Sequence, residues 1–188
     1  MTRILITGNR EKGLSKELAN IWPDATFVSR ASGYDLSNPD QITRVAETCL
    51  FYDVFINNSA LWKFNQVLML DNAYKVAKAA NHNLRILCIG STTDRATKGS
   101  DWIYQQEKKA LRSYCTSLNM MSTWQGGPQV TLLSFGTLSN MQEKHPDRVC
   151  MDIAEAASYV KWIVDQPRYM TINELSLDPL QKVNWNEQ

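Results

Sequence analysis

Short apolar runs alternate along the chain with longer segments whose apolar residues recur every three to four positions. Runs bounded by Gly, Pro or polar residues are typical of buried strands, and the longer segments are typical of amphipathic helices. The predicted strands are 4–7, 25–29, 54–56, 86–89, 130–133 and 171–177. The predicted helices are 13–22, 38–50, 66–80, 101–121 and 152–165.

Regular alternation of strands and helices predicts an α/β fold with a parallel sheet covered on both faces. Asn38, Pro39 and Asp40 form a strong helix start, with a capping side chain, a proline in the first turn and an acid near the positive dipole end. No internal repeat or linker interrupts the 188 residues. We therefore predict a single domain over residues 1–188, a three-layer, doubly wound parallel sheet.

Composition excludes several classes of function. The net charge is +1, from 20 basic and 19 acidic side chains, which gives no electrostatic reason to expect nucleic acid or an anionic membrane as partner. The four cysteines lie far apart without C-x-x-C spacing, so we expect neither a metal site nor a disulfide framework. The first apolar run is short for a signal peptide, and no stretch approaches ~20 apolar residues. We expect a cytoplasmic location.

The turn after the first predicted strand has the composition of a phosphate-binding loop. It reads Thr7-Gly8-Asn9-Arg10-Glu11-Lys12-Gly13-Leu14-Ser15. Gly8 permits a sharp turn off the strand, and Gly13 permits close approach of the chain to a phosphate at a helix N-terminus. By itself this segment is equally compatible with an ordinary glycine-containing loop.

Two basic residues favour a particular dinucleotide. Lys12 precedes the second glycine, and Arg30 follows the second predicted strand, where the adenosine ribose of a dinucleotide lies in such folds. A 2′-phosphate requires a cation at this position, whereas a free 2′-hydroxyl is usually bound by an acid. We therefore expect NADP(H) to be favoured over NAD(H).

A tyrosine and a lysine four residues apart, Tyr104 and Lys108, fall within a predicted helix and share one face. An ammonium beside a phenol lowers the phenol pKa from about 10, which suits the tyrosine for proton exchange with a carbonyl or alcohol. Ser91 lies thirteen residues before Tyr104, at the end of a predicted strand. Tyr74 and Lys78 repeat the spacing, but Leu61 stands thirteen residues earlier and has no hydroxyl.

In combination these segments resemble the short-chain dehydrogenases/reductases, in the family's order and over nearly the whole chain. Besides the glycine turn and the Ser91, Tyr104 and Lys108 set, the matching segments are Asp35-Leu36 near the adenine, Asn57-Asn58-Ser59-Ala60 after a strand, Phe135-Gly136 beside the nicotinamide, and Ile153-Ala154-Glu155-Ala156 and Asn173-Glu174-Leu175 at the end.

The resemblance implies an NADPH-dependent, Rossmann-type oxidoreductase of the carbonyl reductase or alcohol dehydrogenase kind. Tyr104 would be the general acid, Lys108 its pKa-lowering partner and ribose ligand, and Ser91 the donor that positions the reacting oxygen. The expected cofactor contacts are Thr7, Gly8, Asn9, Arg10, Lys12, Gly13, Leu14, Arg30, Asp35, Leu36, Asn58, Ser59, Ala60, Tyr104, Lys108, Phe135 and Gly136. The substrate is a small molecule of unspecified identity.

The resemblance also suggests a homodimer or homotetramer. Trp102, Tyr114 and Met120 are available for such an interface, although residues of these types lie more often in a core. We assign no function to Trp62.

Departures from the family pattern leave two alternatives open. The family's fourth catalytic residue is an asparagine on the helix before the serine strand, where the register places Met69, with Asn65 and Asn72 one turn away. Its loss would fit a cofactor-binding regulator or scaffold. The helix that the family usually has between its second and third strands is missing, because Arg30 is followed almost at once by Tyr34, Asp35 and Leu36. This shortcut resembles sugar-nucleotide reductases, which are the second alternative. Residues 137–151 are short for a substrate lid, which predicts a shallow, open site.

Overall fold

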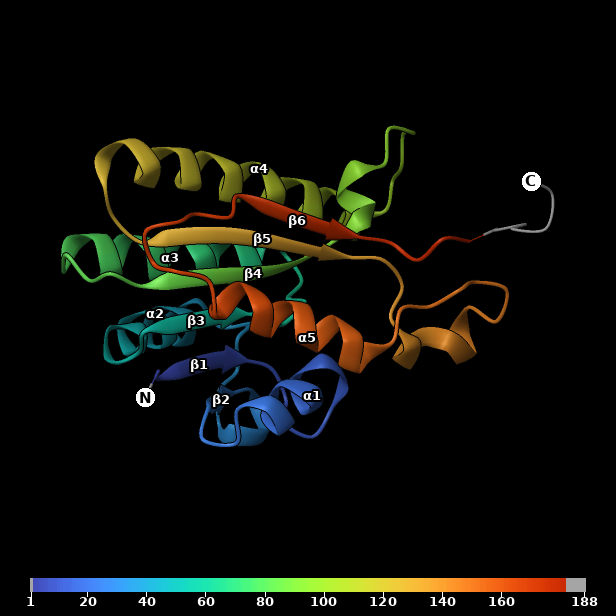
Figure 1. Cartoon of the computed structure of the whole chain (residues 1–188), viewed down its shortest axis with the longest axis horizontal. Coiled ribbons are helices and arrows are strands. Elements are labelled where there is room, and N and C mark those ends of the chain that lie inside the picture. The colour runs from blue at the N-terminus through green and yellow to red at the C-terminus, as the bar shows by residue number, and fades with distance from the viewer. Residues whose placement is uncertain (1, 182–188) are drawn as a thin grey trace.

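The computed structural model describes residues 2–181, and they form one parallel sheet between two layers of helices (Figure 1). The strands are β1 (Ile4–Thr7), β2 (Thr26–Val28), β3 (Val54–Asn57), β4 (Arg85–Ser91), β5 (Gln129–Phe135) and β6 (Glu174–Leu177). The helices are α1 (Gly13–Ile21), α2 (Pro39–Thr48), α3 (Asn65–Ala79), α4 (Ile103–Gln125) and α5 (Ile153–Val164).

Each face of the sheet has its own apolar core. In Figure 1, α1 and α5 lie in front of the sheet, and α2, α3 and α4 lie behind it. Side chains alternate between these faces along each strand: Leu5 and Phe55 pack toward α2, α3 and α4, whereas Ile4 and Ile6 pack toward α1 and α5. Because both faces are buried, the strands carry nearly continuous apolar runs.

The strand order is β2-β1-β3-β4-β5-β6, with every neighbouring pair parallel. The chain therefore moves outward from β1 to β2 and then reverses to build the rest of the sheet from β3. Open parallel sheets bind ligands beyond the carboxyl ends of the strands at such a reversal. All arrowheads in Figure 1 point to one edge of the sheet, which is where the candidate residues should meet.

The predicted three-layer, doubly wound fold is confirmed, with shifts at some element ends. The last strand is shorter than predicted and begins at Glu174, because β6 first pairs with β5 at Leu132. The long helix begins two residues later than predicted and continues to Gln125. Between β2 and α2 the chain makes only the 3₁₀ turn η1 (Arg30–Ser32), as the sequence indicated.

Strand β2 is three residues long and pairs with β1 alone among the described strands. Within residues 2–181, the backbone N–H and C=O groups on the outer edge of β2 therefore pair with no other strand. A short edge strand limits the unpaired backbone that a sheet presents to other chains.

Three general properties hold for residues 2–181. None of the described helices combines the length and apolarity needed to cross a membrane. No three His, Cys, Asp or Glu side chains within this range gather as a metal site. Cys49, Cys88 and Cys115 are buried free thiols.

Candidate active site

The loop between β1 and α1 has the geometry of an anion cradle. Gly8 and Gly13 both have positive φ, +144° and +54°, which other residues adopt only with strain. A Cβ at Gly8 would overlap the Ser15 hydroxyl. No side chain within residues 2–181 caps the helix at Lys12, and the first turn of α1 carries no acid. Its N–H groups and positive dipole end are therefore available to a phosphate.

The segment after β3 is tied to this loop by the β1 threonine. Thr7 Oγ1 accepts hydrogen bonds from the backbone N–H groups of Asn58 (2.9 Å) and Ser59 (3.0 Å). The Asn58 side chain in turn donates to Ser15 Oγ at 2.9 Å. The two loops that flank the reversal in strand order are thus held together, and the cofactor contacts expected of Thr7, Asn58 and Ser59 stay a prediction.

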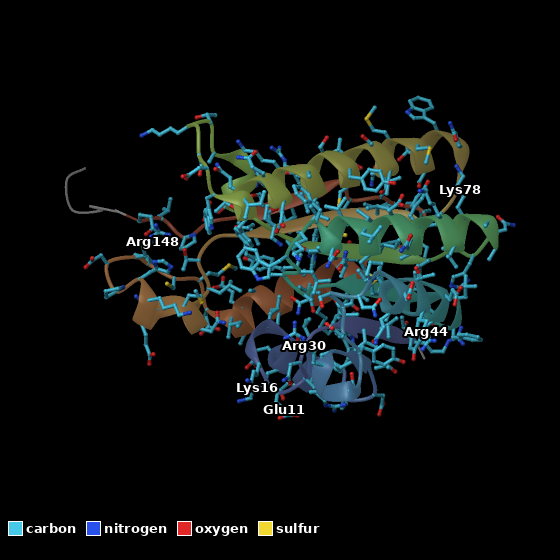
Figure 2. All side chains as sticks on the ribbon, turned by 180° about the vertical axis from the view of Figure 1, so that it is seen from behind. Glu11, Lys16, Arg30, Arg44, Lys78 and Arg148 are labelled. Atoms are coloured by element: carbon cyan, nitrogen blue, oxygen red, sulfur yellow. The ribbon has the colours of Figure 1, made fainter. Side chains whose placement is uncertain are left out.

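The basic residues near this loop differ in their surroundings. Arg10 donates to the Pro23 carbonyl at 2.9 Å and covers the Phe27 ring at 5.5 Å, so its guanidinium is held against the β2 segment. Arg30 is mostly exposed and lies 3.5 Å from the Asp35 carboxylate. Figure 2 shows Arg30 and Lys16 on the side of the molecule that carries α1 and β2.

Asp35 and two of the expected leucines have local roles. The Asp35 carboxylate accepts from Ser37 N (3.1 Å) and Ser37 Oγ (2.7 Å), and these bonds lower the pKa of Asp35. The side chains of Leu14 and Leu36 lie in the two cores. Any contact of Leu14 or Leu36 with a ligand would therefore come from backbone atoms.

Ser91, Tyr104 and Lys108 converge at the carboxyl end of β4. Ser91 is the last residue of β4, and its hydroxyl accepts from Thr93 Oγ1 at 3.0 Å. Tyr104 lies in the first turn of α4, where its phenol is near enough to the Ser91 side chain for Ser91 to act to lower the pKa of Tyr104. Lys108 follows one turn later, with Nζ 5.5 Å from the centre of the Tyr104 ring. The helical spacing thus places hydroxyl, phenol and ammonium in one cluster.

The expectation that Lys108 sets a low pKa for Tyr104 is wrong for this structure. Burial raises the pKa of Tyr104 above 10, and the negative charges of Glu107 and Asp94 add to the increase. Hydrogen bonding with Ser91 opposes this but does not outweigh it. The phenol is therefore the stable form at neutral pH.

Lys108 is almost fully buried, at 4% exposure, and this governs its chemistry. Its Nζ donates to Gln66 Oε1 at 2.7 Å and to the Ile89 carbonyl at 3.1 Å. Burial lowers the pKa of Lys108 to about 8, because the charged form loses its hydration. Two hydrogen-bond acceptors thus stabilise a lysine that would otherwise favour its neutral form.

Gln66 is the site residue that sequence reasoning missed. Its Nε2 donates to the carbonyls of Asn57 (2.9 Å) and Ile89 (3.0 Å), so one amide bridges β3, β4 and the lysine. The sequence directed attention to Asn65, Met69 and Asn72, and Met69 lies fully in the core. The sequence signal that could have identified Gln66 was an amide side chain in the first turn of the helix that follows β3.

Two buried carboxylates also lie behind the cluster without having been predicted. Asp94 accepts from Ser134 Oγ (2.8 Å) and pairs with Arg95 (3.1 Å). Glu107 accepts from the backbone N–H of Phe64 at 3.0 Å. Lys63 and Phe64 both have positive φ, so Glu107 fixes a strained turn at the start of α3.

The segment after β5 reaches the same edge of the sheet. Gly136 N donates to the Leu177 carbonyl at 2.9 Å, and the Asp178 carboxylate occupies the space that a Cβ at Gly136 would need. Thr92 Oγ1 donates to that carboxylate at 3.1 Å. Phe135 itself lies in the core. The expected nicotinamide end is therefore bordered by Gly136, Asp178 and Thr92.

The short segment 137–151 folds back on itself beside the phosphate turn. Leu138 pairs with Met151, and the intervening 3₁₀ turn η4 (Ser139–Lys144) brings Asn140 Nδ2 to 3.6 Å from the position of a Cβ on Gly13. Figure 2 shows Arg148 at the same edge of the sheet, away from Arg44 and Lys78. The Asn140 side chain thus approaches the phosphate turn from one side, at ordinary van der Waals distance.

No family model and no curated protein sequence matches the chain. Solved structures do match. A serine dehydrogenase in complex with NADP+ has a TM-score of 0.73 and 17% identity, covering 97% of this chain and 96% of that one. A short-chain type dehydrogenase/reductase from Mycobacterium marinum has a TM-score of 0.70 and 14% identity, covering 94% and 93%.

An acetoin dehydrogenase from Enterobacter cloacae has a TM-score of 0.72 and 18% identity, covering 95% of this chain and 94% of that one. These similarities extend over nearly the full length of each chain. At such low identity they show a shared fold. The resemblance to short-chain dehydrogenases/reductases is thus confirmed at the level of the fold.

Proposed function

We propose that this chain, which has the fold of short-chain dehydrogenases/reductases, is an NADPH-dependent oxidoreductase of the carbonyl reductase or alcohol dehydrogenase kind, acting as a single domain. The observation that carries the proposal is the convergence of Ser91, Tyr104 and Lys108 at the carboxyl end of β4. A fold alone hosts many functions, so the assignment depends on this cluster.

The proposed reaction is reduction of a carbonyl, or its reverse. A bound nicotinamide cofactor supplies the hydride that forms the new C–H bond. Ser91 donates a hydrogen bond that positions the carbonyl oxygen, and Tyr104 transfers its phenolic proton to that oxygen as the C=O π bond breaks. A Tyr104 pKa above 10 keeps that proton in place at neutral pH.

The residues present fit a dinucleotide. The uncapped N-terminus of α1 and the open backbone at Gly13 suit the pyrophosphate. We propose the remaining contacts from Thr7 to Leu14, from Asn58 to Ala60 and at Gly136. To bind the ribose, Lys108 would give up its hydrogen bond to Gln66 Oε1 or to the Ile89 carbonyl and donate to a ribose hydroxyl instead.

Preference for NADPH is proposed from Arg30 and Lys12, and the serine dehydrogenase with the same fold binds NADP+. Replacing the exposed Arg30 with Ala should weaken NADPH binding about tenfold and leave NADH binding within twofold, because only NADPH carries the 2′-phosphate. Fluorescence titration with each cofactor measures this. Lys78→Ala is the control, since Lys78 lies in the last turn of α3, away from Arg30 (Figure 2). Equal losses for both cofactors would contradict the role of Arg30.

The function itself is tested by titrating the protein with NADPH and NADH and then assaying NADPH oxidation with aldehydes, ketones and quinones. Binding with turnover supports the reductase. Tight binding without turnover on any carbonyl would favour the regulator or scaffold. We regard Gln66 as evidence against that alternative, because its Oε1 accepts a hydrogen bond from Lys108 Nζ and so supplies an amide partner for this lysine.

The homodimer or homotetramer suggested by the resemblance stays a prediction. Phe64, Val67, Leu68 and Tyr114 line an apolar hollow between α3 and α4 that a second copy would cover. Light scattering should give a molar mass of two or four chains. A monomer at assay concentrations would contradict it.

A further inference from the structure

Two indole rings flank the candidate catalytic phenol. The Trp102 ring lies 4.9 Å from the Tyr104 ring, centre to centre, with 35° between the planes. The Trp62 ring lies 6.2 Å from it at 59°. Trp62 belongs to the loop after β3, and Trp102 immediately precedes α4. Two segments that are distant in sequence therefore bring aromatic rings to one side chain.

Both indoles keep much of their surface exposed, 61% for Trp62 and 52% for Trp102. Trp102, expected as core or interface, thus lies at the surface of the site. Large aromatic side chains gain most of their stabilisation from burial, so two exposed rings in contact with a reactive group indicate a surface that a ligand covers. Trp124 and Trp162 are also exposed, but neither is paired with another described aromatic ring.

The charges behind this aromatic surface largely offset one another. The buried carboxylates of Asp94 and Glu107 both act on Tyr104, but Arg95 pairs with Asp94 at 3.1 Å and Lys108 Nζ lies 5.5 Å from the centre of the Tyr104 ring. Among the described residues, the cluster therefore offers no unpaired charge that would select a charged group on the substrate. The exposed indole faces instead favour an uncharged, planar group that can stack in an offset or edge-to-face arrangement.

We propose that Trp62 and Trp102 form a stacking surface for the substrate, and that the substrate is an uncharged carbonyl compound carrying a planar aromatic group next to the reacting carbon. This substrate class rests on the proposed oxidoreductase function. The aromatic group lies against the indoles, and its attached carbonyl oxygen reaches Tyr104 and Ser91. Hydride addition to the carbonyl carbon and proton transfer from Tyr104 then give a benzylic-type alcohol.

Two diketones of matched chemistry test the proposal. Diacetyl and acetylbenzoyl carry the same vicinal dicarbonyl, and a phenyl ring replaces one methyl group in the second. For Trp62→Leu and Trp102→Leu, kcat/KM for acetylbenzoyl with NADPH should fall about tenfold, the equivalent of one lost stacking contact. The value for diacetyl should change less than twofold. Trp124→Leu, at the far end of α4, is the control and should leave both values unchanged.

Equal losses for the two diketones, or no loss for either, would overturn the stacking role. Binding separates this failure from failure of the proposed function. If the parent protein reduces neither compound, equilibrium dialysis of each diketone against the NADPH-loaded protein still reports stacking. Acetylbenzoyl binding that is lost in Trp62→Leu would support the surface without catalysis. Equal binding of the two diketones would reject the surface.

Discussion

Tyr104→Phe is expected to lower kcat for carbonyl reduction about a thousandfold, while the affinity for NADPH stays within twofold. The substitution removes only the phenolic hydroxyl, and positioned general acids contribute on the order of a hundred- to ten-thousandfold. Stopped-flow or steady-state NADPH oxidation measures the loss, and fluorescence titration measures cofactor affinity. The ring is retained, so its contacts with Trp62 and Trp102 are preserved.

Tyr74→Phe is the matched control, because Tyr74 also stands four residues before a lysine. Its hydroxyl contacts Ser122 Oγ at 2.9 Å, far from Ser91 along the fold. This variant should lose about 1 kcal/mol of stability and keep its activity. A Tyr104→Phe protein that reduces carbonyls as fast as the parent would remove the general acid from the mechanism.

The raised pKa of Tyr104 also predicts how kcat/KM for the reverse reaction, alcohol oxidation, depends on pH. Alcohol oxidation requires the deprotonated phenol as base. The pH dependence of kcat/KM reports the pKa values of the free enzyme. Because the pKa of Tyr104 lies above 10, kcat/KM for oxidation should still be rising at pH 10.

Gln66→Leu is expected to lower the free energy of unfolding by about 3 kcal/mol at pH 7. The change removes the closest acceptor of a buried ammonium and two N–H donors from strand carbonyls. Chemical denaturation monitored by tryptophan fluorescence measures it. Gln106→Leu on α4 is the control, since Gln106 makes one long bond of 3.4 Å to the Ser100 carbonyl.

The pH dependence of the free energy of unfolding shows whether Lys108 causes the loss of stability in Gln66→Leu. Its folded-state pKa of about 8 lies below the ordinary value of 10.5, so the parent protein should gain stability as pH rises through this interval and lose it as pH falls through 8. In Gln66→Leu the folded-state pKa falls further, and the difference from the parent should shrink above pH 10.5, where the amine is neutral in both states. A difference that is independent of pH would show that only packing was lost.

Local periodicity explains what could be predicted from the sequence. Tyr104 and Lys108 share a helix face because of their spacing alone, and the turn at Gly8 and Gly13 follows directly from strand and helix boundaries. The place of Ser91 at the end of a strand follows from the same alternation. These features depend on residues close together along the chain.

What could not be predicted depends on contacts between distant segments. Gln66 reaches Lys108 only because α3 and α4 pack side by side, and Trp62 meets Tyr104 only because the turn at Lys63 and Phe64 is fixed by Glu107. The pKa of Tyr104 was predicted in the wrong direction for the same reason. Burial and the charges of Asp94 and Glu107 depend on the whole fold.

The short edge strand β2 makes this architecture extensible. The candidate catalytic cluster lies on β4 and α4, whereas β2 pairs only with β1 among the described strands. The chain leaves β2 through the η1 turn at the edge of the sheet. An additional strand and helix inserted between Ser29 and Tyr34 would dock on the free rim without displacing any strand already present. The sheet can therefore be extended at this end without moving β4 or α4, which marks residues 29–34 as the place where an additional strand could be inserted.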